Sequence, residues 1–309
     1  MLPSESVILP PAFKLASLEM RMRARTCLSF LDWRAGNYFR GQFGITARGL
    51  CCPANCPGAA TCELRKDCHY ANLFEPVPLV AGPSGFANLP RPFVLRTEEL
   101  NGKTFQPGDV FQIRMHLFGN NQALPLIELT FRNLERMELL EMKVVPICIE
   151  LTPQACSSVT LQFLTPTEIK WKEKILHEPQ FPALISRIRD RIAALSTFYG
   201  DGAPDWDYKN LADKSEAIRL VNNNVEMAYA ERRSSRTGQR HGLGGFTGLS
   251  TYEGDLSDFI QLLRVAEWTG VGRHTPWGNG AIRLEVNDNL QLIASVKLNK
   301  SEIPGGLNC

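Results

Sequence analysis

The 309-residue sequence predicts an α+β protein made of two ferredoxin-like (RRM-like) domains, each with the element order βαββαβ, and a glycine-rich loop near the C-terminus. Two observations predict the elements: apolar residues alternate with polar ones in some segments, and recur every three to four residues in others. A third observation divides the chain into two domains: the order βαββαβ repeats after a change of composition at residues 152–156. We therefore expect one domain at residues 1–152 and another at residues 153–309.

In the first half, strand-like alternation is clearest from Leu18 to Ala24 and from Val110 onward. A helix is predicted at residues 38–50, although Gly41 and Gly44 lower helix stability there. The remaining elements of the first domain follow from shorter patterns: strands at 93–96 and 142–151, and a helix at 123–135.

The first strand carries an arginine at every second position, namely Arg21, Arg23 and Arg25. Like charges on one strand face repel each other unless an anion relieves them, so this face is a candidate RNA-binding surface. A solvated face is the alternative for any single arginine. If the strand that carries Arg114 is a neighbour, the face becomes an arginine platform.

The second half repeats the pattern with strands at 158–164, 217–232, 243–252 and 281–286, and helices at 182–198 and 255–267. Asp255 is the predicted N-cap of the last helix. A basic hairpin between two of these strands suits phosphate binding, because the guanidinium fork of arginine matches phosphate geometry, although a solvated loop is the alternative. Its basic residues are Arg232, Arg233, Arg236, Arg240 and His241.

The glycine-rich loop follows the last helix and precedes the last strand. It contains Gly270, Gly272, Gly278 and Gly280, which flank Arg273 and His274. A dinucleotide-binding loop has the opposite order of strand, glycines and helix, so we reject a nucleotide cofactor. Glycines permit close approach of a backbone, which makes the loop a candidate phosphate cradle. The alternative is an ordinary connection between helix and strand.

A cysteine-rich insertion occupies residues 51–69, and the chain has nine cysteines in total. Thiolates that are separated by proline and glycine can surround a tetrahedral zinc ion or an iron-sulfur cluster. The alternative is a loop of reduced cysteines without metal. The predicted ligands of a structural metal are Cys52, Cys56, Cys62 and Cys68, with Cys51 as an alternative to Cys52.

Composition limits the classes of function. The net charge is only +2 and 44% of residues are hydrophobic, so a nucleic-acid surface must come from local clusters of charge in a globular protein. No stretch reaches the roughly 20 apolar residues of a membrane span, and the N-terminus lacks the features of a signal peptide. We expect a cytoplasmic protein without a membrane partner.

Several motifs together resemble the CRISPR-associated precursor-crRNA-processing endoribonucleases of the RAMP superfamily. The C-terminal signature G-x-G-[KR]-x-T-x-x-G-x-G is matched by residues 270–280, between a helix and a short final strand. The resemblance spans nearly the whole chain. The other stretches that carry it are residues 38–44, 70–76, 107–109, 117–119 and 163–169.

This resemblance implies cleavage of CRISPR repeat RNA without a catalytic cofactor or metal, which leaves a 2′,3′-cyclic phosphate. Similar enzymes often place a catalytic histidine in or just after the first helix, but residues 32–50 contain none. We therefore predict His69 as general base or acid, with Tyr38 and Arg40 beside it. The alternatives for His69 are a metal ligand and a structural residue. His274, within the glycine loop, could instead touch the scissile region or only bind a phosphate, and His116 is expected on the polar face of its strand.

A non-catalytic RAMP subunit that binds crRNA is the alternative function, and the absent histidine keeps it open. The expected partners are repeat RNA or crRNA and other subunits of a CRISPR effector complex. A metal-dependent redox or regulatory protein would explain the cysteines, but it would leave the glycine loop and the arginines unexplained.

Overall fold

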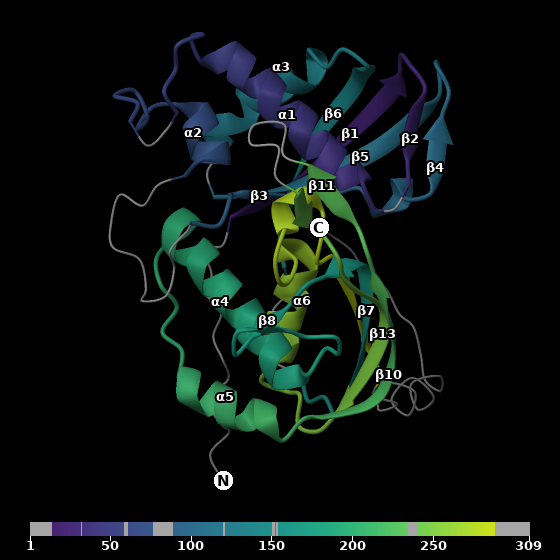
Figure 1. Ribbon diagram of the computed structural model, residues 1–309. Helices are drawn as coiled ribbons and strands as arrows, with labels where there is room; N and C mark the ends of the chain where they lie inside the picture. Colours follow the sequence, from purple (N-terminus) through teal and green to yellow (C-terminus); the bar gives the residue numbers. More distant parts are fainter. Residues whose placement is uncertain are drawn as a thin grey trace, which may run out of the picture.

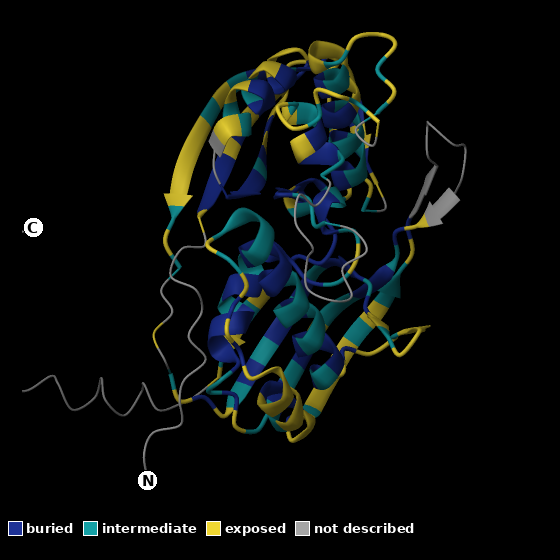
Figure 2. Ribbon diagram, turned by 90° about the vertical axis from the view of Figure 1, so that its left-hand side faces the viewer, coloured by how far each residue is buried: buried dark blue, intermediate teal, exposed yellow. Residues whose placement is uncertain are grey.

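The computed structural model describes residues 14–31, 33–58, 61–76, 89–119, 121–149, 152, 154–233 and 240–287. They form two lobes stacked one on the other: a first lobe (residues 14–149) at the top of Figure 1 and a second lobe (residues 154–287) below it. Each lobe contains a four-stranded antiparallel sheet and its own hydrophobic cluster. The buried residues of both lobes are coloured dark blue on the ribbon of Figure 2. A smaller cluster, in which Phe118 and Leu195 take part, joins the two lobes.

The first sheet has the strand order β3-β5-β1-β6. This is the ferredoxin-like order, in which the first strand lies between the third and the fourth. Alternating side chains of β1 lie on opposite faces of the sheet: Leu18, Met20 and Met22 are buried, while the residues between them are exposed. Phe43 of α1 and Phe131 of α3 stack over this buried face with ring centroids 5.3 Å apart. The bounds are β1 Leu15–Ala24, β3 Phe93–Arg96, β5 Val110–Phe118, β6 Met137–Ile147, α1 Ala35–Cys51 and α3 Leu124–Arg132.

Three short elements in the first lobe have no clear sequence signal. Helix α2 (His69–Phe74) lies beside α1, and the ring centroids of Phe43 and Phe74 are 4.7 Å apart. Strands β2 (Leu28–Phe30) and β4 (Lys103–Phe105) pair with each other as a separate ribbon.

The second sheet has the same order, β10-β13-β7-β14. Helices α4 and α6 pack on one face, where Ile188 and Leu263 belong to the same buried cluster. The fold is therefore α+β with two ferredoxin-like units, as predicted. The bounds are β7 Ser158–Thr167, β8 Lys170–Trp171, β9 Lys174–Ile175, α4 Phe181–Tyr199, α5 Tyr208–Glu216, β10 Arg219–Ala228, β11 Glu231–Arg233, β12 Arg240–Gly242, β13 Gly245–Glu253, α6 Ile260–Thr269 and β14 Ile282–Val286.

Of the predicted starts, two differ most from the structure. Asp255 is not the N-cap of α6, because its carboxylate accepts a hydrogen bond from the backbone N–H of Ser257 and holds a turn before the helix, which begins at Ile260. Strand β6 begins at Met137, five residues before the predicted start, because its backbone pairs with β1 from Ala24 onward. Among the described residues, no helix is long and apolar enough to cross a membrane.

Candidate nucleic-acid interface

The glycine-rich loop (residues 270–280) folds back on itself between α6 and β14. A Cβ at Gly272 would lie 2.4 Å from the backbone oxygen of Glu168, and one at Gly280 would lie 1.9 Å from that of Val271. Backbone conformation and contacts inside the protein therefore require these glycines. Their predicted contact with RNA stays a prediction. All four have a left-handed φ between 71° and 87°: Gly270, Gly272, Gly278 and Gly280.

The loop also contains a strained residue and an accessible cation. His274 has a left-handed φ of 64°, which costs an L-residue about 1 kcal/mol and is a feature of functional sites. Its ring lies edge-on to Trp277, with centroids 5.7 Å apart. Arg273 is half exposed and pairs with the carboxylate of Glu168. The sequence-predicted pair Arg273 and His274 thus lies at the surface of the loop.

Helix α1 begins directly against this loop. A Cβ at Gly36 would lie only 1.9 Å from the carbonyl oxygen of Trp277, so the two backbones are in contact. The contact brings the start of α1, in the first lobe, to the loop of the second lobe. This proximity follows from the absence of a side chain at Gly36.

An arginine–tryptophan junction, formed by Arg40, Arg91 and Trp277, lies at this contact. The guanidinium carbon of Arg40 is 5.0 Å from the centre of the Trp277 ring, and that of Arg91 is 5.2 Å from it. Arg40 also lies 5.4 Å from the ring of Phe74 in α2. Both guanidinium groups are within cation–π range, so the rings hold two positive charges at the boundary of the lobes.

The carbonyl end of α6 fixes the position of the glycine loop. Arg96 of β3 donates from Nη2 to the carbonyl oxygens of Glu267 at 2.6 Å and Trp268 at 3.1 Å. Arg191 of α4 donates from Nε to the carbonyl oxygen of Thr269 at 2.7 Å. Cations at a helix C-terminus offset its negative partial charge, so these arginines form a cap that spans the two lobes.

Burial perturbs the charged groups of this cap. It lowers the pKa of Arg96 to about 10 and that of Arg191 to about 9, so both remain protonated at neutral pH. His116 of β5 bonds through Nδ1 to the carbonyl oxygen of Trp268 at 2.9 Å, and its ring lies 4.8 Å from the indole. Burial and the charge of Arg96 lower the pKa of His116 to about 3, so its imidazole is neutral and Nδ1 carries the proton.

Two of the predicted catalytic residues, Tyr38 and Arg40, do not face the same way. The ring of Tyr38 packs edge-on against Phe30 at 5.6 Å and against Phe39 at 5.5 Å, in the first hydrophobic cluster. Burial raises the pKa of its phenol, and the charge of Arg136 opposes that change. Residues two apart in a helix point to different sides, which explains why Arg40 lies against Trp277 instead.

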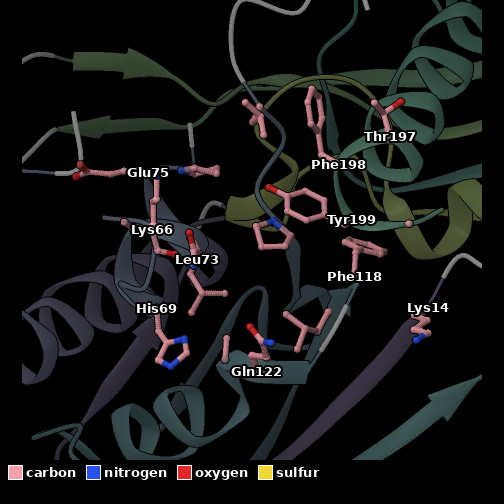
Figure 3. Close-up of a pocket in the computed structure, with 18 of the residues that line it drawn as sticks. Lys14, Lys66, His69, Leu73, Glu75, Phe118, Gln122, Thr197, Phe198 and Tyr199 are labelled. Atoms are coloured by element: carbon pink, nitrogen blue, oxygen red, sulfur yellow. Dashed lines mark hydrogen bonds between the residues drawn. The ribbon is translucent and has the colours of Figure 1, made fainter. Parts of the chain in front are cut away.

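His69, the third predicted catalytic residue, is exposed at the start of α2 and lines a cavity of about 630 Å³ between the lobes. In Figure 3, His69 comes from α2 and Lys66 from the segment before it, whereas Phe198 and Tyr199 come from α4. Neither Tyr38 nor Arg40 is among the described residues that line this cavity. The structure therefore does not bring the predicted trio into one pocket, and their roles stay predictions.

The predicted arginine platform has the expected neighbours. Strands β1 and β5 pair directly, with Arg21 opposite Gln112, and Arg21, Arg23 and Arg25 are all exposed. The face is not purely cationic, because Arg23 pairs with Glu138 at 3.1 Å. Arg114 on the neighbouring strand likewise pairs with two glutamates, Glu98 and Glu99. RNA binding by the platform stays a prediction.

The basic hairpin is described only in its backbone. Strands β11 and β12 pair antiparallel, with Arg232 opposite His241 and Arg233 opposite Arg240. Arg236 lies outside the described residues. The predicted RNA contacts of this hairpin therefore remain predictions.

The cysteine-rich insertion brings its thiols close together. Cys52 hydrogen-bonds to Cys56; burial, followed by this bond, raises the pKa of Cys52 to about 12. The pKa of Cys56 is lowered, first by the backbone N–H of Gly58 and then by the thiols of Cys52 and Cys62 and the charge of Arg48. Within the described part of the chain, no three His, Cys, Asp or Glu side chains are grouped as metal ligands.

Comparisons with known proteins agree with this architecture. Residues 161–282 match the sequence profile of the CRISPR-associated endoribonuclease Cas6 family, and residues 13–151 match a profile described as an N-terminal domain. No curated protein matches the chain in sequence.

Three solved structures share the fold at low sequence identity. Cas6 of Thermus thermophilus is 16% identical with a TM-score of 0.52, and the match covers 89% of this chain and 100% of that one. A Cas6 product complex is 16% identical with a TM-score of 0.55, covering 88% of this chain and 100% of that one. A partial Cas6-RT-Cas1–Cas2 complex is 12% identical with a TM-score of 0.53, covering 97% of this chain and 49% of that one.

The chain thus combines two ferredoxin-like units with a glycine-rich loop, and arginines gather where the two units meet. The second lobe is similar to the CRISPR-associated endoribonuclease Cas6 family over most of its length. The solved Cas6 structures share the fold of both lobes.

Sequence reasoning missed several residues of this interface. Arg91 follows a segment rich in proline and glycine and belongs to no periodic pattern, so nothing local connects it with Trp277. His116 was expected on the polar face of a strand, and the second lobe covers that end of the face. Trp268 precedes the loop and Trp277 lies within it, and a tryptophan that becomes buried usually finds a partner for its indole N–H, which was the available signal.

Proposed function

We propose that this protein is an endoribonuclease that cleaves CRISPR repeat RNA by metal-independent acid–base catalysis and leaves a 2′,3′-cyclic phosphate. One observation carries the proposal: Arg40 of α1 and Arg91 lie over the Trp277 ring of the glycine loop, where the lobes meet. Guanidinium groups held on an aromatic ring can bind phosphates and stack on bases, which suits a single-stranded RNA.

The reaction needs three contributions from the protein. A base removes the proton of the 2′-hydroxyl, an acid protonates the departing 5′-oxygen, and cations stabilise the charge that develops on the phosphoryl oxygens. The proposal assigns the third contribution to Arg40, because its guanidinium is already positioned by Phe74 and Trp277.

The proposal assigns proton transfer to His69, with His274 as the competing histidine. His69 is exposed on the cavity between the lobes, so RNA could reach it from solvent. His274 lies beside Trp277 within the junction itself. Tyr38 is the weakest of the predicted catalytic residues, because its ring is packed against Phe30 and Phe39.

Cleavage assays on the cognate repeat RNA in excess chelator test this function. We expect cleavage at one site with a cyclic-phosphate end, and a loss of about 100-fold in single-turnover rate for whichever of His69→Ala and His274→Ala removes the acid or base. His177→Ala is the matched control, because His177 is exposed in a loop of the second lobe. Cleavage that stops in chelator and returns with Mg²⁺ would contradict the metal-independent reaction.

A second function follows from a specific observation: α1 contains no histidine. A protein with the same cationic junction but no suitable acid or base would hold crRNA without cutting it. Tight binding of repeat RNA by the wild type, with no cleavage product in chelator or in Mg²⁺, would favour this RNA-holding subunit over the nuclease.

The proposed partners are repeat RNA or crRNA and other CRISPR proteins. One matched structure is a product complex and another is a complex of Cas6-RT-Cas1 with Cas2, and those names describe the matched proteins. Copurification of this chain with crRNA, followed by sequencing of the bound RNA, would test the RNA partner directly.

A further inference from the structure

The cavity between the lobes in Figure 3 has the size of a small-ligand site. Its volume of about 630 Å³ lies within the range of roughly 300–1,000 Å³ that such sites occupy. Leu73 of α2 and Phe118 of β5 belong to its wall in the first lobe, and Phe198 and Tyr199 of α4 belong to its wall in the second. Proton transfer at His69 does not require a hollow of this size, so the rest of the lining indicates a further ligand.

Positive charge exceeds negative charge in this lining. Lys14, Arg65 and Lys66 line the cavity, and within the described part of the chain their side chains form no ion pair or hydrogen bond. The carboxylates that line it are those of Glu75 and Asp201. Lys14 and Lys66 are exposed, so a ligand from solvent meets them first. Cations without carboxylate partners attract an anion, and a phosphate group satisfies several of them at once.

Aromatic rings give the cavity a surface on which a base can stack. Phe198 is partly exposed and belongs to none of the hydrophobic clusters of the described residues, so its ring is not committed to the core. Tyr199 beside it is fixed, because its hydroxyl donates to the carbonyl oxygen of Pro90 at 2.6 Å. In Figure 3, Lys66 and Lys14 lie on opposite sides of these two rings. Rings between two cations suit a nucleotide, because the base stacks while the phosphates on its two sides pair with the cations.

The cavity shares a segment of its wall with the arginine–tryptophan junction. Leu89 and Pro92 line the cavity, while Arg91 from the same segment lies over the Trp277 ring. Arg91 also donates from Nε to the carbonyl oxygen of Phe74 at 3.0 Å, at the end of α2. An RNA strand bound at the junction can therefore continue into the cavity around this one segment.

We propose that the cavity holds one unpaired nucleotide of the repeat RNA, next to the phosphate at the arginine–tryptophan junction. Phe198 stacks on its base, and Lys66 and Lys14 contact the phosphates on its two sides. This inference rests on the proposed function, because it places a further part of the same RNA. Every base has a face that can stack, so the cavity selects an unpaired nucleotide and not a particular base.

A set of repeat RNAs, each with one abasic nucleotide, tests the proposal by equilibrium binding to the full-length protein. Methylation of every 2′-hydroxyl prevents cleavage during the titration. At one position, loss of the base should weaken binding by about fivefold or more, because base stacking on an aromatic ring is lost. Phe198→Ala should weaken binding of the intact RNA to a similar extent and should show no further loss at that position, since both changes remove one contact.

Tyr208→Ala is the matched control for removal of a ring, because Tyr208 is 40% exposed on α5 and does not line the cavity. It should leave the loss at the abasic position unchanged. Lys66→Ala covers the case in which Phe198→Ala does not fold, because Lys66 is exposed. It should reduce the slope of log affinity against log salt by about 0.7, whereas Lys209→Ala, an exposed lysine of α5, should not.

The outcomes separate this inference from the nuclease function. If unmodified repeat RNA is cleaved but no abasic position is coupled to Phe198, the function stands and the cavity assignment is overturned. An unchanged salt slope in Lys66→Ala also overturns it. If the RNA binds without being cleaved and one abasic position is coupled to Phe198, the nuclease fails while the cavity assignment stands. Absence of any RNA binding by the wild type overturns both.

Discussion

Arg96 in the first lobe donates a hydrogen bond of 2.6 Å to the backbone carbonyl of Glu267 in the second lobe, 171 residues further along the chain. The guanidinium is buried and also reaches the carbonyl of Trp268. The last carbonyls of a helix need partners, and here the partner comes from the other lobe. The glycine loop begins at Gly270, three residues after Glu267. The bond to Glu267 therefore fixes where the loop meets α1.

Replacing Arg96 with methionine should destabilise the protein by about 3 kcal/mol, because two charge-assisted hydrogen bonds are lost and the helix carbonyls remain buried. Urea unfolding measures the change. Arg114→Met on the neighbouring strand is the control: Arg114 is 42% exposed and pairs with Glu98 and Glu99, so its loss should cost less than about 1 kcal/mol. If the two variants lose equal unfolding free energy, the buried hydrogen bonds of Arg96 contribute no more to stability than an exposed ion pair does.

His116 should make stability depend on pH. Its folded pKa of about 3 lies below the ordinary value of 6.5, so the unfolded chain binds a proton that the folded protein does not. This contribution to stability is complete above pH 6.5 and is lost progressively as the pH falls toward 3.

We therefore expect the stability advantage of the wild type over His116→Gln to shrink by on the order of 2 kcal/mol between pH 7 and pH 5. Unfolding free energies at the two pH values give this difference. His177→Gln, which replaces an exposed histidine in a loop of the second lobe, is the control for removal of an imidazole. A constant difference for His116→Gln would contradict the buried, neutral imidazole.

Two glycines of α1 offer a matched pair of substitutions. A Cβ at Gly36 would collide with the backbone of Trp277, so Gly36→Ala should destabilise the protein by about 2 kcal/mol and weaken RNA binding. A Cβ at Gly41 would meet nothing within 4 Å, so Gly41→Ala should add up to about 1 kcal/mol of stability. Thermal unfolding and RNA titration measure both effects, and a neutral Gly36→Ala would show that α1 need not contact the loop.

Arg273 should contribute to RNA binding through its charge. If it neutralises one phosphate of a single strand, Arg273→Ala should reduce the slope of log affinity against log salt by about 0.7. Binding titrations at several salt concentrations give the slope. Arg132→Ala in α3 is the control, because the two side chains are similarly exposed (52% and 53%) and each pairs with a glutamate. A slope that is unchanged in Arg273→Ala would place the loop away from the phosphates.

The sheets and long helices were predictable because each has a local period. Alternation in β1 and β5 predicted both strands and their buried faces, and the ferredoxin-like order predicted that the two strands are neighbours. Helix α2 and the β2–β4 ribbon were not predicted, because six residues and three residues are too short to show a period.

The interface was less predictable, because it depends on contacts between distant segments. Tyr38 and Arg40 were grouped as sequence neighbours, yet helical geometry sends one into the core and the other to Trp277. His116 was expected on the polar face of its strand, and the second lobe buries it there through the contact with Trp268. Contacts between distant segments produce no periodic pattern in the sequence of either segment alone.

The contact between Gly36 and Trp277 also sets an order of events during synthesis. A ribosome releases α1 long before the glycine loop, so the first lobe can pair its strands while the surface around Gly36 and Arg96 still faces water. The final docking of the lobes must wait until α6 and the loop have emerged. A nascent chain arrested before residue 270 would therefore hold a folded first sheet whose cationic surface around Arg96 has no partner lobe.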